Sequence, residues 1–367
     1  MTKAAELAKM GEVLTNSQIG GRRNIIINGA MNVAQRATSA TGVGASAGYF
    51  TCDRWKIETN ATAGRATMSQ TADVHDGFAN CLKLDCTTAD TSIAASELFQ
   101  ISHKLEGQDL QQLKKGTSSA ESFTVSFYVK ASGSFTFGLE AFDNDNDRQM
   151  TKLFTTTTDW VRHELTFPAD TTGTLDDDNA LSMFLSFWLH SGSTFTSGTL
   201  GTSFASSTSG NRAAGIDSFF SSTDNNFFLT GVQMEVGSQA TPFEHRSFGE
   251  ERQLCYRYYY QMKAATSFMK IGHGRAYDTS NTTATYPVPV PMRANPTGSV
   301  SANSDVGVAG LSSGGTTGTN AAAETFDDFS RFAINVTRSG ADLTSGNIFQ
   351  VESDNNTDMT IKLDAEL

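Results

Sequence analysis

Apolar and polar side chains alternate along many short segments between residues 24 and 246, and turn-forming residues separate these segments. Residues 122–130 are the clearest case, with one face made of Phe123, Val125, Phe127 and Val129. A period of two residues is typical of a half-buried β-strand. Residues 181–189 are apolar on both faces, which predicts a central strand covered from both sides. Six or more such strands predict a mainly β chain whose principal domain is a jelly-roll β-sandwich.

A helical period marks the start of the chain. In residues 2–14, Leu7, Met10 and Leu14 recur at spacings of three and four, which predicts a short amphipathic helix. A helix of this length is marginal alone in water. We therefore expect its apolar stripe to pack on its own domain, on symmetry mates or on a different protein.

The pattern changes again after Val236. Gly237 and Ser238 break the strand, and Ser247 followed by Glu250 is typical of a capping box at the start of a helix. Shorter alternating segments then resume and continue to the last residues. We divide the chain into an N-terminal helix and linker, a sandwich, a helical linker and a smaller C-terminal β domain, at residues 1–23, 24–246, 247–257 and 258–367.

Three segments inside these domains are less regular. Residues 25–27 (III) predict a short strand before the turn signal Asn28-Gly29. Residues 190–225 are rich in Ser, Thr and Gly, and are either a β-excursion or an exposed functional loop. Residues 297–325 have a similar composition, which predicts a loop.

Composition and charge exclude several classes of function. The net charge is −12, so binding to nucleic acid through its phosphates is not expected, and anionic membranes are disfavoured. No stretch is long and apolar enough for a membrane span, so we expect no membrane insertion, and no secretion signal is recognisable. The four cysteines, Cys52, Cys81, Cys86 and Cys255, are interpreted as buried free thiols, although a disulfide from Cys52 to Cys81 or Cys86 stays open.

No catalytic motif accompanies this composition. The six histidines show no helical i, i+4 pair, and neither a nucleophile elbow nor a phosphate-binding loop is present. Trp55, Trp160 and Trp188 could stack on sugar rings, but each stands in or beside a strand where core packing is the favoured interpretation. We therefore expect a protein that is not an enzyme.

One acidic run could hold a cation. Asp143, Asp145 and Asp147 alternate with asparagines after a predicted strand, and such oxygen ligands suit Ca²⁺. The run lacks the glycine and the distal glutamate of an EF-hand. A solvated turn is the favoured alternative, because Asp and Asn stabilise turns through their backbone contacts. No other cofactor is expected.

Several motifs, in order along the chain, resemble tailed-bacteriophage tail fibres and receptor-binding proteins. They are NIIINGAMNVAQR at 24–36, DRW at 53–55, VQMEVG at 232–237, ATPFEHR at 240–246, GEE at 249–251 and PMRANPT at 291–297. In that family the segment at 232–246 closes a jelly roll similar to a carbohydrate-binding module. The middle of the chain, including residues 190–225, shows no such resemblance.

The resemblance implies a homotrimer in the tail of a virion, either a fibre or a tail tip. The N-terminal helix, through Leu7, Met10 and Leu14, would attach to a phage tail protein, and the C-terminal domain would be distal and face the receptor. The ligand would be a polysaccharide of the host surface. Glu244, His245 and Arg246 would form interdomain or intersubunit contacts. The alternatives are a glycan depolymerase or hydrolase on the same scaffold, and a purely structural joint of the tail.

Overall fold

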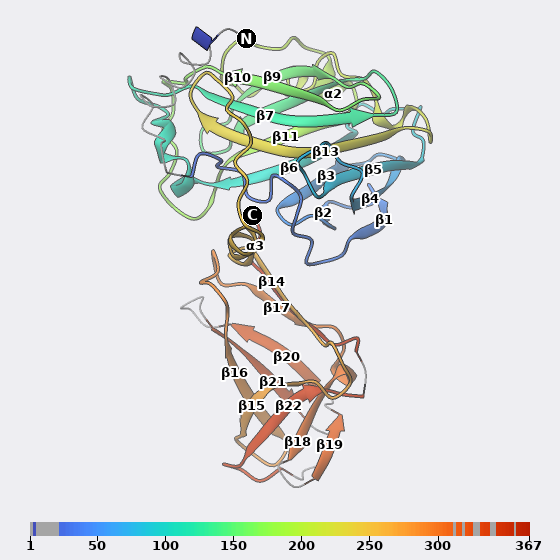
Figure 1. Cartoon of the computed structure of the whole chain (residues 1–367), viewed down its shortest axis with the longest axis vertical. Helices are drawn as coiled ribbons and strands as arrows, with labels where there is room; N and C mark the ends of the chain where they lie inside the picture. Colours follow the sequence, from blue (N-terminus) through green and yellow to red (C-terminus); the bar gives the residue numbers. More distant parts are fainter. Residues whose placement is uncertain are drawn as a thin grey trace. The chain divides into compact units, whose positions relative to one another are not determined.

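The structure, a computed structural model, describes residues 3–4, 22–310, 313–317, 320–325, 331–337, 343–355 and 357–367 (Figure 1). The chain forms two compact units, Met1–Glu251 with Leu367, and Arg252–Glu366. Each unit has its own hydrophobic core. Strands dominate both units, so the prediction of a mainly β chain is confirmed.

The first unit is a sandwich of two antiparallel sheets. The six-stranded sheet has the order β1 (Ser39–Val43), β4 (Arg65–Thr71), β5 (Cys81–Thr88), β13 (Asn226–Val236), β7 (Phe123–Ala131) and β10 (Val161–Phe167). The seven-stranded sheet has the order β12 (Ala205–Ser206), β9 (Arg148–Thr155), β8 (Thr136–Asp143), β11 (Leu181–Ser191), β6 (Leu98–Glu106), β3 (Trp55–Asn60) and β2 (Gly48–Tyr49). From β5 to β13 the chain crosses repeatedly between the sheets, as in a jelly roll.

Aromatic and aliphatic side chains from the inner faces fill the space between the two sheets. Phe127 and Phe187, one from each sheet, meet edge to face with ring centroids 5.1 Å apart. The alternation read from residues 122–130 points the expected side chains inward, because Phe123, Val125, Phe127 and Val129 are all buried. Strand β11 lies between β6 and β8 and is buried along most of its length, which confirms the predicted central strand.

The segment at 190–225 is packed on the sandwich and contains short regular elements. These are α2 (Ser193–Thr196), β12, η3 (Ser209–Asn211) and η4 (Phe219–Ser221). Phe204, Phe219 and Phe220 from this segment are buried in the core. The short 3-10 helices η1 (Gly107–Asp109) and η2 (Gln111–Leu113) connect β6 to β7.

The second unit contains a three-stranded and a seven-stranded sheet. The first has the order β14 (Tyr259–Lys263), β23 (Thr360–Asp364) and β17 (Thr297–Val300). The second has the order β19 (Ser313–Thr317), β18 (Val306–Gly310), β22 (Ile348–Ser353), β15 (Lys270–Ala276), β16 (Asn281–Pro287), β21 (Arg331–Thr337) and β20 (Asn320–Thr325). The described part of 297–325 thus contains four strands and η5 (Asn303–Asp305), so the prediction of a loop there is wrong. Composition is a weak guide to strands in this segment, because strand preference depends on the packing context of each side chain.

Helix α3 (Phe248–Tyr256) contains the division between the units. Its N-terminus carries the predicted capping box, in which Glu250 accepts hydrogen bonds from Ser247 N and Oγ, and Glu250 N donates to Ser247 Oγ. These contacts hold the pKa of Glu250 below its ordinary value. Of the predicted helix at 2–14, only residues 3 and 4 are described, and Leu7, Met10 and Leu14 lie outside the described residues.

Candidate functional site

The outer face of the seven-stranded sheet is unusually polar for a sheet centre. In the antiparallel register Glu58 of β3 lies opposite Gln100 of β6, and Ser102 of β6 lies opposite Ser186 of β11. Residues opposite each other share one face of a sheet, so these four side chains form a continuous polar surface. Ile101, which alternates with them, points into the core.

A groove of about 360 Å³ runs across this face. Its lining includes Glu58, Asn60, Gln100, Lys104, Phe184 and Arg212. The strands β3, β6 and β11 therefore supply most of its floor, and the 190–225 segment supplies Arg212. A concave site with an apolar surface and a few converging polar groups is the usual form of a ligand site.

The apolar part of the groove is an aromatic pair. Phe184 of β11 stacks on Phe142 of β8, with centroids 4.8 Å apart and ring planes 10° from parallel. Phe142 is buried, whereas Phe184 is half-buried. The pair thus presents one flat ring toward the groove and supports it from the side with a second ring.

Arg212 is held rigidly beside this pair. Its guanidinium donates from Nε and from the NH2 nitrogen to the two oxygens of Glu140, both at 2.8 Å, and lies 4.7 Å from the ring centroid of Phe142. Glu140 is fully buried and also accepts a hydrogen bond from Trp188 Nε1 at 2.9 Å. Planar bidentate pairs of this kind fix geometry as well as charge. The buried Trp188 therefore supports Glu140 and, through it, Arg212 at the side of the groove. The predicted packing role of Trp188 is confirmed.

A second set of charges lies at the opposite side of the groove lining. Lys104 Nζ is 3.3 Å from Glu58 Oε1, and Lys56 Nζ is 3.0 Å from the same oxygen. Burial lowers the pKa of Lys104, and the attraction of Glu58 acts in the opposite direction. The groove therefore offers ammonium, carboxylate and amide groups, which can donate and accept hydrogen bonds around an apolar ring.

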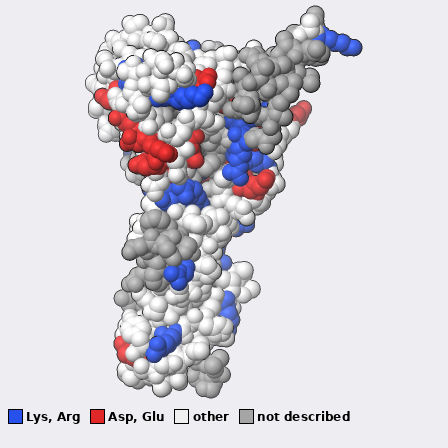
Figure 2. All heavy atoms as spheres, turned by 90° about the vertical axis from the view of Figure 1, so that its left-hand side faces the viewer, with Lys and Arg blue, Asp and Glu red and all other residues white. Residues whose placement is uncertain are grey.

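On the face drawn in Figure 2, uncharged residues make up most of the visible surface, and acidic and basic side chains gather in separate small groups. This agrees with the low charged fraction of the chain, 18%. Among the described residues, no helix has both the length and the apolar composition required to cross a membrane.

The acidic run predicted for calcium lies in the turn between β8 and β9. Asp143 is fully buried and its Oδ2 is 2.5 Å from Lys115 Nζ, while its Oδ1 accepts hydrogen bonds from the backbone N–H groups of Asp145 and Asn146. Asp147 occupies a left-handed position with φ of 50°. Within the described residues, the carboxylates of Asp143, Asp145 and Asp147 do not converge around one point. The geometry favours the alternative, a turn whose first carboxylate neutralises a buried lysine.

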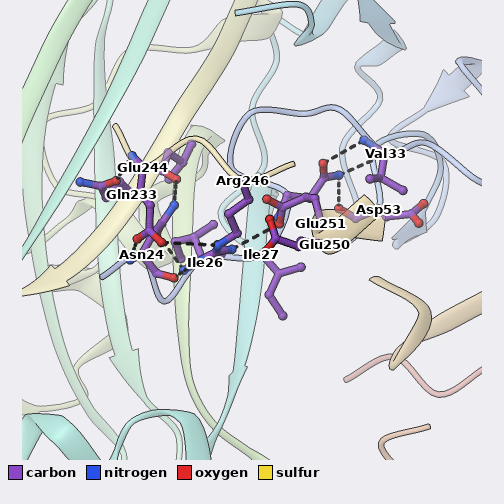
Figure 3. A network of polar contacts seen from close by, with 12 residues as sticks. Asn24, Ile26, Ile27, Val33, Asp53, Gln233, Glu244, Arg246, Glu250 and Glu251 are labelled. Atoms are coloured by element: carbon purple, nitrogen blue, oxygen red, sulfur yellow. Dashed lines mark hydrogen bonds and ion pairs between the residues drawn. The ribbon is translucent and has the colours of Figure 1, made fainter. Parts of the chain in front are cut away.

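Glu244 and Arg246 hold the N-terminal segment of the first unit (Figure 3). Glu244 Oε2 accepts hydrogen bonds from the backbone N–H groups of Arg23 and Asn24, both at 2.7 Å. Arg246 donates to the backbone oxygens of Asn24 and Ile26. The prediction gave these residues contacts between domains or subunits, whereas the contacts described here lie inside the first unit.

Two further residues complete this polar network. Glu251 Oε1 accepts from Asn28 N and lies 3.4 Å from an NH nitrogen of Arg246. Asn28 in turn bonds Val33 and the backbone oxygen of Asp53. His245 packs on Phe78 and Phe243 instead. The motifs at 24–36, 53–55, 240–246 and 249–251 therefore meet in one structural cluster.

Comparisons with known proteins give only distant likenesses. No family model matches the chain, and no curated protein matches it either. Among solved structures, the carbohydrate-binding module CBM4 is 14% identical, with a TM-score of 0.28, and the match covers 50% of this chain and 87% of that one. TmCBM61 in complex with β-1,4-galactotriose is 10% identical, with a TM-score of 0.30, over 58% of this chain and 99% of that one.

The enzymatically active domain of tailspike protein 4 from bacteriophage CBA120 is also similar. It is 9% identical with a TM-score of 0.29, and the match covers 58% of this chain but 21% of that chain. Identities and TM-scores this low carry no argument about what the chain binds. The groove must be judged from its own residues.

Sequence reasoning did not single out the groove residues. Gln100 and Lys104 lie on strand β6 (Leu98–Glu106), where no sequence motif sets them apart from their neighbours. One signal was available for Arg212, which is the only basic residue between 190 and 225. A single arginine in a long segment rich in Ser, Thr and Gly is a candidate for a specific contact.

Proposed function

We propose that this chain is a non-enzymatic glycan-binding protein of a phage virion, either a tail fibre or another receptor-binding protein of the tail. The observation that carries the glycan-binding part is the groove on the seven-stranded sheet, where the stacked ring of Phe184 lies among planar polar groups. One face of a pyranose ring is largely C–H, and it complements a flat aromatic surface. The surrounding hydroxyls require the donors and acceptors that Gln100, Lys104 and Glu58 supply.

The virion part of the proposal rests on the sequence motifs that resemble phage fibre proteins. These motifs explain why an amphipathic stripe at residues 2–14 is present, because a tail protein or symmetry mates would cover it. A homotrimer joined to the tail through its N-terminus, with a polysaccharide of the host surface as receptor, completes the proposal.

Binding is tested with the purified full chain and surface polysaccharide from candidate hosts. We expect Phe184→Ala to weaken binding about tenfold, because it removes the half-buried stacking ring and leaves the buried core intact. A tenfold loss corresponds to about 1.4 kcal/mol. Lys104→Ala should also weaken binding. Isothermal titration with size-fractionated oligosaccharides measures both effects.

Lys83→Ala is the matched control for Lys104→Ala. Lys83 lies on a strand of the other sheet and, like Lys104, is paired with a neighbouring carboxylate, here Asp85 at 2.8 Å. Equal loss of binding in both lysine variants would contradict a site in the groove. Release of oligosaccharide when the protein is incubated with the polysaccharide would overturn the non-enzymatic assignment. A protein that neither adsorbs to host cells nor competes with phage adsorption would favour a structural joint of the tail.

A further inference from the structure

Three buried titratable side chains meet outside the residues that line the groove. Asp90, Glu97 and His190 are exposed by 5%, 5% and 0%, and their ligand-type atoms all lie within 4.8 Å of one another. Asp90 follows β5, Glu97 precedes β6, and His190 stands near the end of β11. Folding of the first unit therefore brings together three groups from separate segments.

The charges of this group are not balanced by a basic side chain. Among the described residues, no lysine or arginine forms an ion pair with Asp90 or Glu97. Each carboxyl group nevertheless has an oxygen within 4.8 Å of an oxygen of the other. Two buried carboxylates this close are stabilised by a shared proton or by a cation between them.

One oxygen of each carboxylate accepts hydrogen bonds from neighbouring groups. Asp90 Oδ2 accepts hydrogen bonds from Thr62 Oγ1 and Ala63 N, both at 2.8 Å. Glu97 Oε1 accepts from Ala94 N at 2.9 Å, which leaves Oε2 turned toward His190. These contacts orient the second oxygen of Glu97 toward the imidazole of His190, at 3.2 Å from Nε2.

The histidine is oriented in the same way. His190 Nδ1 lies 2.7 Å from Ser218 Oγ, and Nε2 lies 3.2 Å from Glu97 Oε2. A metal-bound histidine is usually held by a hydrogen bond from its other ring nitrogen. Two ligand atoms about 2.0–2.1 Å from a tetrahedral Zn²⁺ are about 3.3 Å apart. The spacing of Nε2 and Oε2 therefore suits two adjacent ligands of one ion.

We propose that Asp90, Glu97 and His190 form a binding site for a divalent transition-metal ion, with Zn²⁺ as the ion that the mixed nitrogen and oxygen donors suit. Water would complete a four-coordinate shell. Because the three side chains are buried, the ion is structural. It ties the segment between β5 and β6 to the end of β11 and, through Ser218, to the 190–225 segment.

The test uses the full chain, first freed of metal with a chelator and then titrated with Zn²⁺. We expect about one equivalent to bind, together with a rise in the melting temperature of the first unit. His190→Gln should lose this equivalent. His163→Gln is the matched control and should retain it, because His163 is half-buried on β10 and its Nε2 contacts only a backbone oxygen, that of Thr155.

Two results would overturn the proposal. The first is that the metal-free wild type takes up no Zn²⁺, which would leave a shared proton as the link between the carboxyls. The second is that the His190→Gln variant binds Zn²⁺ as well as the wild type does. If His190→Gln does not fold, Co²⁺ is loaded into the wild type instead. Intense visible absorption bands of four-coordinate Co²⁺ support the site, whereas weak six-coordinate bands, or uptake of Ca²⁺ but not Zn²⁺, contradict it.

Discussion

Arg246 shows how one side chain can join distant parts of a domain. Its side chain is 6% exposed and reaches the backbone oxygens of Asn24 and Ile26 as well as the carboxylate of Glu251. An arginine suits this role because its guanidinium donates in several fixed directions at once. Removing the Arg246 side chain would leave these buried acceptors without donors, and buried acceptors without donors lower the stability of the fold.

We predict that Arg246→Ala lowers the free energy of unfolding of the first unit by about 3 kcal/mol, the usual cost of breaking a buried charged contact. Denaturant unfolding followed by tryptophan fluorescence reports on this unit alone, because Trp55, Trp160 and Trp188 all lie within it.

The control for Arg246 is an exposed ion pair. Lys114 Nζ lies 2.8 Å from Glu121 Oε1, and both side chains are largely in water, so Lys114→Ala should cost less than about 1 kcal/mol. Similar losses in the two variants would show that Arg246 contributes no more than a surface contact.

The limits of sequence reading at the residue scale are physical. The DNDND run offers alternating oxygen ligands, as a calcium loop does, but its first carboxylate, Asp143, pairs with Lys115, which is 28 residues earlier. The cysteine interpretation is confirmed because it needed only burial, and all four cysteines are buried thiols that form no disulfide. Long-range pairing decides which polar residues act together, and a linear pattern does not contain it.

At the scale of elements, the segment at 24–29 differs from its prediction. The Asn28-Gly29 turn is present, with φ of 58° at Asn28, but residues 25–27 are not a strand, so that prediction is wrong. Strand β5 pairs with β13 only as far as Leu229, so β5 does not cover the edge of β13 beyond this residue. Asn24 and Ile25 bond to Met234 there, partly through the Asn24 side chain, so a regular ladder does not form.

Gly29 is required at the end of this segment. Val232 N donates to Gly29 O at 2.9 Å, and a Cβ atom at residue 29 would lie 2.0 Å from Val232 O. We predict that Gly29→Ala destabilises the first unit by about 1–3 kcal/mol, because the backbone must move away from β13. Tryptophan-detected unfolding measures the loss.

Gly249→Ala serves as the comparison for this variant. Gly249 lies in the first turn of α3, and a Cβ atom there would meet nothing within 4 Å. Alanine should leave stability unchanged or raise it by up to about 1 kcal/mol, because it favours helix. If both alanine variants behave alike, close packing at Gly29 is not the cause.

At the scale of the whole molecule, periodicity was sufficient for the class of fold. Alternation identified strands of the sandwich such as β7, which has one face in the core. It was not sufficient for the groove, whose lining comes from β3, β6, β11 and the 190–225 segment. Those residues become neighbours only through sheet order and register.

The proposed attachment to a tail makes a prediction at this scale. Deleting residues 1–15 should leave both cores intact, because every core residue in the described part of the chain lies outside the deletion. The shortened protein should therefore fold, as circular dichroism would show, yet fail to join virions assembled in its presence. Incorporation of the shortened protein at the level of the full chain would contradict a role of Leu7, Met10 and Leu14 in attachment.

The network around Arg246 also has a mechanical consequence. Residues 23–28 and 244–251 are the two places where the chain enters and leaves the sandwich, and Glu244, Arg246 and Glu251 bond one to the other. A pulling force applied through the chain on either side is therefore carried first by these contacts between residues 23–28 and 244–251. Apart from β13, which Asn24 and Ile25 also contact, the strands of the two sheets bear little of the load until these contacts break, so a ligand-binding surface built on β3, β6 and β11 would keep its shape under tension.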